Sequence, residues 1–317
     1  MTLDPAIKAL LEATPRTPSI IGADIPAYRA AINAATAAAP RYDVPLASVA
    51  DRTIDLPGRS IGIRIYTPQG DGPFPIVAYY HGGGFVIGDL EVADAICRAI
   101  ASGTGAVLVS VDYRLAPEHP FPAANDDAWD ALNWIVDHAA DLNGDPARIA
   151  VAGDSAGANI SASMTLRARA AGLPLAAQVL MYGAPAYPDL TLPSFNEHAN
   201  GPLITRDEAI YYWGHYLPDP ADRTNPDAAA AHATSHAGLP PAFVASGECD
   251  PTRDTGEAYA DLLAAAGVPT VKRRYAGMPH GFFSWVPYVP SVRTAMGELC
   301  EWLLGKLERV KGIEPSS

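Results

Sequence analysis

Short apolar runs alternate with longer segments of helical length along most of the chain. Several of the runs are apolar almost throughout, as strands covered on both faces are, and they are rich in residues that favour strands. Glycine or proline bounds each of these runs, which are 61–66, 76–80, 106–111, 149–153, 178–182, 242–247 and 271–275. We interpret them as the strands of a largely buried sheet.

Five segments with helical patterns lie between or after these runs. They are 92–102, 123–138, 156–171, 255–266 and 289–307. Strands and helices that alternate this regularly are typical of a mainly parallel sheet with helices on both faces. The pattern therefore predicts an α/β fold.

Two segments interrupt the alternation, residues 1–45 and about 184–235. Insertions at the carboxyl edge of such a sheet often cover the site as a lid. We therefore expect an N-terminal cap segment over 1–45 and a catalytic domain over 46–317, with a cap insertion at about 184–235. We also expect residues 311–317 to fray.

An aromatic cluster lies within the second of these segments. Its members are Tyr211, Tyr212, Trp213 and Tyr216. Two interpretations are equally favoured at this point. The rings either line a pocket beneath a cap or pack a surface helix.

Composition and charge narrow the classes of function. Apolar residues make up 49% of the chain and charged residues 18%, which predicts a compact core rather than disorder. With 22 Lys and Arg against 35 Asp and Glu, the formal charge is −13. Nucleic acids and anionic membranes both select positive surfaces, so we expect neither as a partner.

The cysteines and the N-terminal sequence bear on the compartment. Cys97, Cys249 and Cys300 are odd in number and far apart, and they form no CxxC or Cys/His cluster, so we expect neither a disulfide framework nor a metal site. The chain starts without a basic region followed by an apolar one, and no run reaches the roughly 18 apolar residues of a membrane span. These features predict a cytoplasmic protein.

The strongest chemical signal is the sequence GDSAG at 153–157, which follows a predicted strand and opens a predicted helix. A serine on such a tight turn is held in strained backbone geometry with its hydroxyl projecting, and the flanking glycines let strand and helix approach. The adjoining helix N-terminus favours negative charge. The pattern therefore indicates that Ser155 is a nucleophile.

A serine nucleophile needs a base, and the base needs an acid to hold its tautomer. Asp250 follows the sixth run and His280 follows the seventh, where a parallel sheet places its functional loops. The order Ser155, Asp250, His280 is that of α/β-hydrolases. Glu248 and Asp254 flank the acid, but Glu248 lies close to the strand end and Asp254 at a helix start, where capping is the usual role.

A different triad can also be read from the chain. His81, Asp112 and Ser155 follow the order of trypsin-like proteases, but those enzymes are all-β barrels and this chain alternates strands with helices. The remaining histidines are interpreted as surface or supporting residues: His119, His138, His198, His215, His232 and His236.

Three consecutive glycines follow His81, directly after the second run. Glycines leave backbone N–H groups unshielded, as an oxyanion hole requires, and α/β-hydrolases place their upstream donor loop here. We expect donors from Gly83, Gly84 and Ala156. Loss of one such donor costs roughly 10²–10³ in rate in other enzymes.

Together these motifs resemble the hormone-sensitive lipase-like family of α/β-hydrolases, the bacterial family IV esterases. The resemblance covers about residues 50–307. It rests on HGGGF at 81–85, DYRLAPE at 112–118, GDSAG at 153–157, DPTRD at 250–254 and HGF at 280–282.

The resemblance implies an α/β-hydrolase fold with a helical cap and carboxylic ester hydrolysis without a cofactor or metal. It implies that Ser155, Asp250 and His280 form the triad, that Asp154 marks the GDSAG subgroup, and that His81 organises the glycine loop. This chain has Thr252 where the family commonly has leucine, a departure that bears on how the acid loop packs. Family members often pair through the last strand and helix, so a homodimer through 271–275 and 289–307 is expected.

We therefore expect a carboxylesterase that hydrolyses short- to medium-chain esters, with a small-molecule ester as its partner. The same triad and oxyanion hole serve any acyl transfer, so an amidase, a lactonase or a deacetylase is the main alternative. Receptors with this fold bind a small ligand after losing the histidine. Because His280 is present, that alternative is weaker.

Overall fold

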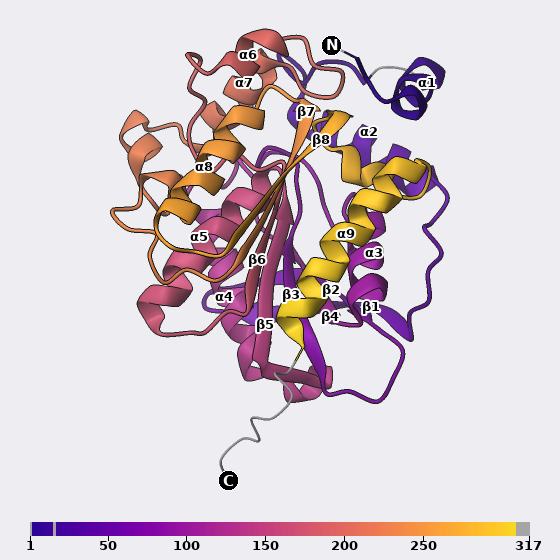
Figure 1. Ribbon diagram of the computed structural model, residues 1–317, viewed down its shortest axis with the longest axis vertical. Coiled ribbons are helices and arrows are strands. Elements are labelled where there is room, and N and C mark those ends of the chain that lie inside the picture. Colours follow the sequence, from indigo (N-terminus) through magenta and orange to yellow (C-terminus); the bar gives the residue numbers. More distant parts are fainter. Residues whose placement is uncertain (1, 15–16, 309–317) are drawn as a thin grey trace.

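The computed structural model describes residues 2–14 and 17–308, and eight strands of this part form one sheet (Figure 1). The expected fraying of 311–317 lies outside the described residues. In spatial order the strands are β1 (Ser48–Leu56), β2 (Arg59–Thr67), β4 (Val107–Asp112), β3 (Phe74–Tyr80), β5 (Gly144–Asp154), β6 (Ala177–Met181), β7 (Ala242–Cys249) and β8 (Thr270–Pro279). The pairs from β4 to β8 are parallel, whereas β1–β2 and β2–β4 are antiparallel.

All seven predicted strands are present, and β1 is an addition to them. It pairs with β2 from Ser48 opposite Thr67 to Leu56 opposite Arg59. Only Ile54 and Leu56 of this strand are buried, because β1 lies at the edge of the sheet. An edge strand exposes most of its side chains, so β1 has no apolar run by which to recognise it.

Five helices cover the two faces of the sheet and confirm the predicted α/β architecture. α3 (Asp94–Thr104) and α9 (Pro290–Leu307) pack on one face. α4 (Ala123–Asp137), α5 (Ala156–Ala171) and α8 (Arg253–Ala265) pack on the other. Successive residues of a strand point to opposite faces.

β3 shows this alternation clearly. Val77 and Tyr79 belong to the core beneath α3 and α9, whereas Ile76, Ala78 and Tyr80 belong to the core beneath α4 and α5. All five of these side chains have 0% exposure, which is why the run is apolar throughout.

The two irregular segments gather at one end of the sheet (Figure 1). They contain α1 (Pro5–Ala13), α2 (Ile25–Ala38), α6 (Pro193–Glu197), α7 (Arg206–Tyr216) and the short 3₁₀ helices η2 (Pro220–Thr224) and η3 (Ala230–His232). Two more 3₁₀ turns lie outside them, η1 (Ala140–Leu142) and η4 (Phe282–Trp285). Whether this end is a separate cap over a domain at 46–317 stays a prediction.

The polar residues at the helix starts explain where α2 and α7 begin. The carboxylate of Asp24 accepts a hydrogen bond from Ala27 N–H at the start of α2. Thr205 and Glu208 form a reciprocal capping box at the start of α7. Such caps satisfy backbone donors that the first turn leaves without partners.

Arg29 fastens α2 to the body of the protein. Its guanidinium donates to the carbonyls of Val86 (2.6 Å) and Ala116 (2.7 Å), and it pairs in bidentate fashion with Glu118 (2.9 and 2.8 Å). Val86 lies just after the HGGGF sequence, so this contact anchors the N-terminal segment next to the predicted donor loop.

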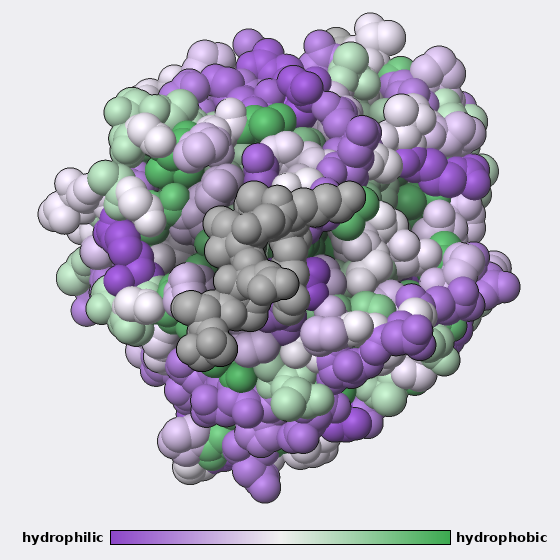
Figure 2. Space-filling model, turned by 60° about the horizontal axis from the view of Figure 1, so that its bottom comes forward, coloured by the Kyte–Doolittle hydropathy of each residue, from purple (hydrophilic) through white to green (hydrophobic). Residues whose placement is uncertain are grey.

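The face in Figure 2 is mostly hydrophilic, with hydrophobic residues in small separate groups. Single exposed apolar side chains of this kind are normal on a protein surface. Within residues 2–14 and 17–308, no helix combines the length and the hydrophobicity that crossing a bilayer requires.

Candidate active site

Ser155 lies on the turn between β5 and α5, in a backbone conformation with φ 52° and ψ −117°. Positive φ is strained for a residue with a side chain and persists where the surroundings enforce it. Two glycines make this turn possible, because a Cβ on Gly157 would overlap the carbonyl of Tyr80 and one on Gly153 would overlap that of Gly157. The sequence therefore folds into the tight strand–turn–helix that GDSAG predicts.

The structure brings Ser155, His280 and Asp250 together in one hydrogen-bonded chain. The Ser155 hydroxyl lies 2.8 Å from Nε2 of His280, and Nδ1 of His280 lies 2.8 Å from Oδ2 of Asp250. Asp250 follows β7 and His280 follows β8, so neighbouring parallel strands deliver the two side chains to the same edge. Nδ1–H donates to the carboxylate, which leaves Nε2 as the acceptor for the serine proton.

Opposing effects set the basicity of His280. Burial lowers the pKa of His280, but the charge and the hydrogen bond of Asp250 and the charge of Asp154 raise it more, so the net pKa lies above its ordinary value. A base with a raised pKa holds a proton more firmly once it has accepted one.

The three predicted oxyanion donors lie on two neighbouring segments. Within residues 2–14 and 17–308, the backbone N–H groups of Gly83, Gly84 and Ala156 donate to no acceptor. Gly84 and Ala156 line the same cavity as Ser155. Gly83 precedes Gly84 in the sequence and is not among the lining residues. These N–H groups remain available for a ligand oxygen, as an anion-binding site requires.

Asp154 holds the glycine loop in place. Its Oδ1 accepts hydrogen bonds from Gly82 N–H (2.8 Å) and from the Tyr79 hydroxyl (2.6 Å). Burial raises the pKa of Asp154, although both of these donors stabilise its charged form. The residue just before Ser155 therefore also anchors the predicted donor loop.

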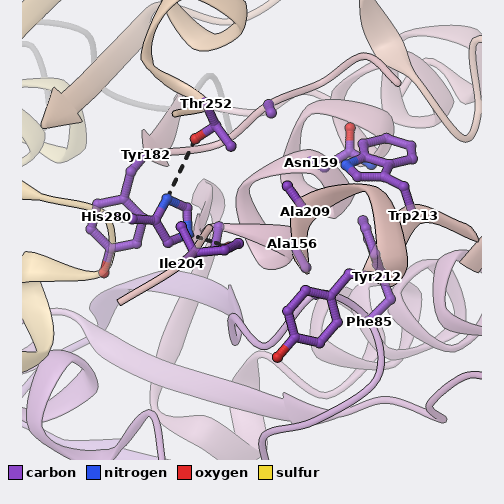
Figure 3. A pocket seen from close by; sticks show the side chains of 13 residues that line it. Phe85, Ala156, Asn159, Tyr182, Ile204, Ala209, Tyr212, Trp213, Thr252 and His280 are labelled. Carbon is purple, nitrogen blue, oxygen red and sulfur yellow. Dashed lines mark hydrogen bonds between the residues drawn. The ribbon is translucent and has the colours of Figure 1, made fainter. Parts of the chain in front are cut away.

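A cavity of about 370 Å³, measured with its open mouth, joins these groups (Figure 3). Its wall is largely apolar, which suits a small organic ligand. The lining residues are Gly84, Phe85, Ser155, Ala156, Asn159, Tyr182, Ala184, Ile204, Ala209, Tyr212, Trp213, Thr252 and His280.

Backbone strain is concentrated on this wall. Phe85, Ser155 and Tyr182 are not glycines, yet each has positive φ, at 65°, 52° and 41°. Conformations of this kind cluster at functional sites because surrounding contacts must hold them.

The aromatic residues of α7 do not all have the same role: some line the pocket and one packs against the protein. Tyr212 and Trp213 line the cavity. Tyr216 instead stacks on Phe85 at 3.7 Å between centroids and donates its hydroxyl to Asn125 (2.6 Å). One turn of helix therefore supplies both a pocket wall and a packing face.

The competing acids have other partners. Glu248 accepts the N–H of Gly277 (2.7 Å), while Asp254 accepts the N–H of Ser194 (2.8 Å) and pairs with Arg253. Neither takes the place of Asp250 beside His280.

The trypsin-like order is wrong for this chain. Nδ1 of His81 lies 2.7 Å from the carbonyl of Gly82, and its ring stacks on Tyr113 at 4.2 Å. Among the described residues His81 has no hydrogen bond to Ser155 or to Asp112. It supports the glycine loop instead.

Among the lining residues with polar side chains, three have no counterpart among the predicted site residues: Asn159, Tyr182 and Thr252. Tyr182 directly follows β6, so the rule that sites lie beyond parallel strands could have identified it. Asn159 lies one helical turn after Ser155, which places both on one face of α5. In the sequence, Thr252 is notable only because the family that the chain resembles commonly has leucine at this position.

Within residues 2–14 and 17–308, no three His, Cys, Asp or Glu side chains are grouped as a metal site would require. Cys97, Cys249 and Cys300 are each free and buried.

Comparison with known protein families identifies the fold. A family described as alpha/beta hydrolase fold matches residues 77–284. The carboxylesterase NlhH of Mycobacterium tuberculosis is 43% identical over 302 residues, which cover 93% of each chain. The esterase LipI of the same organism is 44% identical over 263 residues, 81% of this chain and 82% of that protein.

Solved structures agree with these relatives. The thermophilic carboxylesterase EstE1, cloned from a metagenomic library, superposes with a TM-score of 0.86 at 38% identity, over 91% of this chain and 99% of that one. A hyperthermophilic esterase from Pyrobaculum calidifontis gives a TM-score of 0.87 at 37% identity, over 96% and 99%. The similarity therefore spans the whole fold.

Proposed function

This chain belongs to the alpha/beta hydrolase fold family and is a serine ester hydrolase, and from this premise we propose that Ser155, His280 and Asp250 carry its chemistry. The resemblance to the hormone-sensitive lipase-like esterases is confirmed, while assignment to the GDSAG subgroup stays a prediction. The proposed reaction is hydrolysis of short- to medium-chain carboxylic esters. The unbroken hydrogen-bonded chain from Ser155 through His280 to Asp250 carries the proposal.

In the first half of the reaction, Ser155 Oγ attacks the ester carbonyl while Nε2 of His280 takes its proton. The N–H groups of Gly83, Gly84 and Ala156 stabilise the oxyanion that forms. Asp250 stabilises the imidazolium. His280 then gives the proton to the leaving alcohol, and the acyl group stays on Ser155.

In the second half, a water replaces the alcohol. His280 takes a proton from the water as its oxygen attacks the acyl-enzyme, and the same N–H groups again hold the oxyanion. When the tetrahedral species collapses, the bond to Ser155 Oγ breaks and His280 returns the proton to that oxygen. The carboxylic acid leaves, and the enzyme needs no cofactor.

We further propose that the N-terminal segment over 1–45 and the insertion at about 184–235 act as a cap over the catalytic domain at 46–317. The contributions of Ile204, Tyr212 and Trp213 to the cavity wall support this role. The cavity is narrow beside Ser155 and has a largely apolar wall, which favours short to medium acyl chains.

A homodimer through β8 and α9 and a cytoplasmic location complete the proposal. β8 ends the sheet, and within the described residues it pairs only with β7, so its outer edge is open to a second strand. The free, buried cysteines support a reducing compartment.

The test is hydrolysis of p-nitrophenyl esters from acetate to palmitate by the wild type and by Ser155→Ala. We expect a wild-type optimum at short to medium chains, and a variant reduced by about 10⁶-fold because the nucleophile is missing. Ser161→Ala is the matched control, since this serine lies on the helix that Ser155 precedes and its hydroxyl donates to the Gly157 carbonyl. Wild-type turnover of amides or lactones but not of esters would overturn the proposal, as would an active Ser155→Ala.

A further inference from the structure

Thr252 lies beside the triad without being part of it. Its side chain is 6% exposed and lines the cavity, two residues after Asp250. The backbone N–H of Thr252 donates to Oδ1 of Asp250 at 2.7 Å, and its hydroxyl donates to the same oxygen at 2.9 Å. Figure 3 shows the hydroxyl oxygen directed at Nδ1 of His280, 3.4 Å away.

The Thr252 hydroxyl does not cap the helix that follows it, although its position is that of a capping residue. Thr252 is the N-cap residue of α8, and a threonine there usually accepts a hydrogen bond from the first turn of the helix. Here it makes no such bond. The N–H of Asp254 donates instead to the hydroxyl of Ser194 (3.2 Å), so a residue of α6 caps the helix in its place.

The two oxygens of the Asp250 carboxylate have different partners. Oδ2 faces Nδ1 of His280 at 2.8 Å, whereas Oδ1 receives both donors of Thr252. The carboxylate is completely buried, so its charge depends on hydrogen-bond donors held close to it. Rotation of the carboxylate away from His280 would break both contacts with Thr252. A leucine at this position keeps the N–H and loses the hydroxyl.

We propose that Thr252 is a positioning residue, whose hydroxyl holds the Asp250 carboxylate toward His280 and stabilises its negative charge. This inference rests on the proposed function, because it assigns Thr252 a part in the same proton transfer. Without the hydroxyl, the carboxylate is less firmly oriented and its charge is less well solvated. The reaction should slow, and the imidazolium should be attracted more strongly.

Other titratable groups near His280 and Asp250 come from several elements. Asp154 from β5 and Tyr182 after β6 face His280. Arg253 of α8 lies three residues after Asp250 in the sequence and donates to His198, next to α6, at 3.1 Å. Replacing Thr252 changes none of these four residues. A shift in the titration of His280 can therefore be attributed to the lost hydroxyl.

The experiment compares Thr252→Val, which is nearly isosteric, with Thr252→Ser, which restores the hydroxyl. Thr255→Val is the matched control, because its hydroxyl is also buried on α8 but has no hydrogen-bond partner in the part of the chain that the structure describes. For each protein, kcat and kcat/KM for p-nitrophenyl acetate are measured against pH. Proton NMR of the His280 Nδ1–H without substrate gives an independent titration.

In Thr252→Val we expect kcat to fall by about tenfold, as for loss of a hydrogen bond to a charged group. We also expect the acidic limb of kcat/KM and the NMR titration to move together to higher pH, by roughly half a unit. Thr252→Ser should lie close to the wild type in both readouts, and Thr255→Val should not move either.

The proposal would be overturned if, in Thr252→Val, the acidic limb of kcat/KM and the NMR titration of His280 both stayed at their wild-type pH values. This holds whatever the activity of that variant. Equal behaviour of Thr252→Ser and Thr252→Val would overturn it too. Failure of the proposed function would be visible separately, as a wild type that does not hydrolyse the ester. In that case the NMR titration still decides the role of Thr252.

Discussion

Gly84→Ala tests the donor loop where the structure leaves no room for a side chain. Gly84 has φ +60°, and a Cβ there would overlap the ring of Tyr212 and lie 2.8 Å from the Cβ of that residue. Gly105→Ala is a close control, because Gly105 has φ +62° and nothing within 4 Å of the added atom. Both variants place an alanine in left-handed backbone geometry, but only in Gly84→Ala does the new methyl group overlap Tyr212.

The shared strain should cost about 1 kcal/mol of stability in both variants, as for an alanine in left-handed geometry. Carbon atoms in contact normally lie about 3.5–4.0 Å apart, so in Gly84→Ala the loop or the ring must move by about 1 Å. A displacement of this size at a reacting centre costs about 10²-fold in rate. We therefore expect kcat to fall by about 10²-fold in Gly84→Ala and to stay unchanged in Gly105→Ala.

The assay is kcat for p-nitrophenyl acetate together with urea unfolding of each variant. Gly84→Ala combined with Tyr212→Gly should recover most of the lost rate, because the second change removes both the ring and the Cβ that the new methyl group meets. Wild-type kcat in Gly84→Ala would refute the assignment of this loop to the oxyanion. A double variant as slow as Gly84→Ala alone would refute the steric explanation.

Two further predictions concern pH and chain length. His280, the proposed base, can accept a proton only while neutral. Because its pKa is raised, kcat/KM should fall as pH drops through a value above the ordinary pKa of histidine. Asp250→Asn removes the charge that raises this pKa, so it should move the acidic limb to lower pH and slow the reaction by about 10⁴-fold in a pH–rate profile. Tyr212→Ala should increase kcat/KM for octanoate relative to acetate, since each additional buried methylene contributes about 0.8 kcal/mol; an unchanged ratio over a p-nitrophenyl ester series would show that α7 does not limit the cavity.

The sequence pattern predicts the buried part of the fold well and the exposed part poorly. The expected helix 156–171 coincides with α5, because it starts at the GDSAG turn and ends at Gly172, which has the left-handed conformation typical of a helix end. β1 has only two buried residues, so its sequence resembles a loop. The antiparallel direction of β2 follows from its pairing with β1 and β4, which no local pattern records.

The site also has one part that the sequence pattern could predict and one that it could not. Ser155, Asp250 and His280 could be assigned because each follows a strand whose carboxyl end lies at the same edge. The part of Thr252 could not, because it depends on a hydroxyl reaching back to Asp250 while Ser194, far away in the sequence, caps α8. Contacts between distant segments leave no periodic signal in the chain.

The position of Asp154 has a consequence for how the enzyme can vary. This carboxylate joins Gly82 and Tyr79 to the end of β5, and β3 and β5 pair directly in the sheet. The spacing between Ser155 and the proposed anion donors is therefore set by contacts with the paired strands β3 and β5. Tyr212, in contrast, meets the loop by van der Waals contact. The helices above can shift or change their side chains to admit a different ester while the reacting atoms keep their geometry, so rate and selectivity can diverge independently.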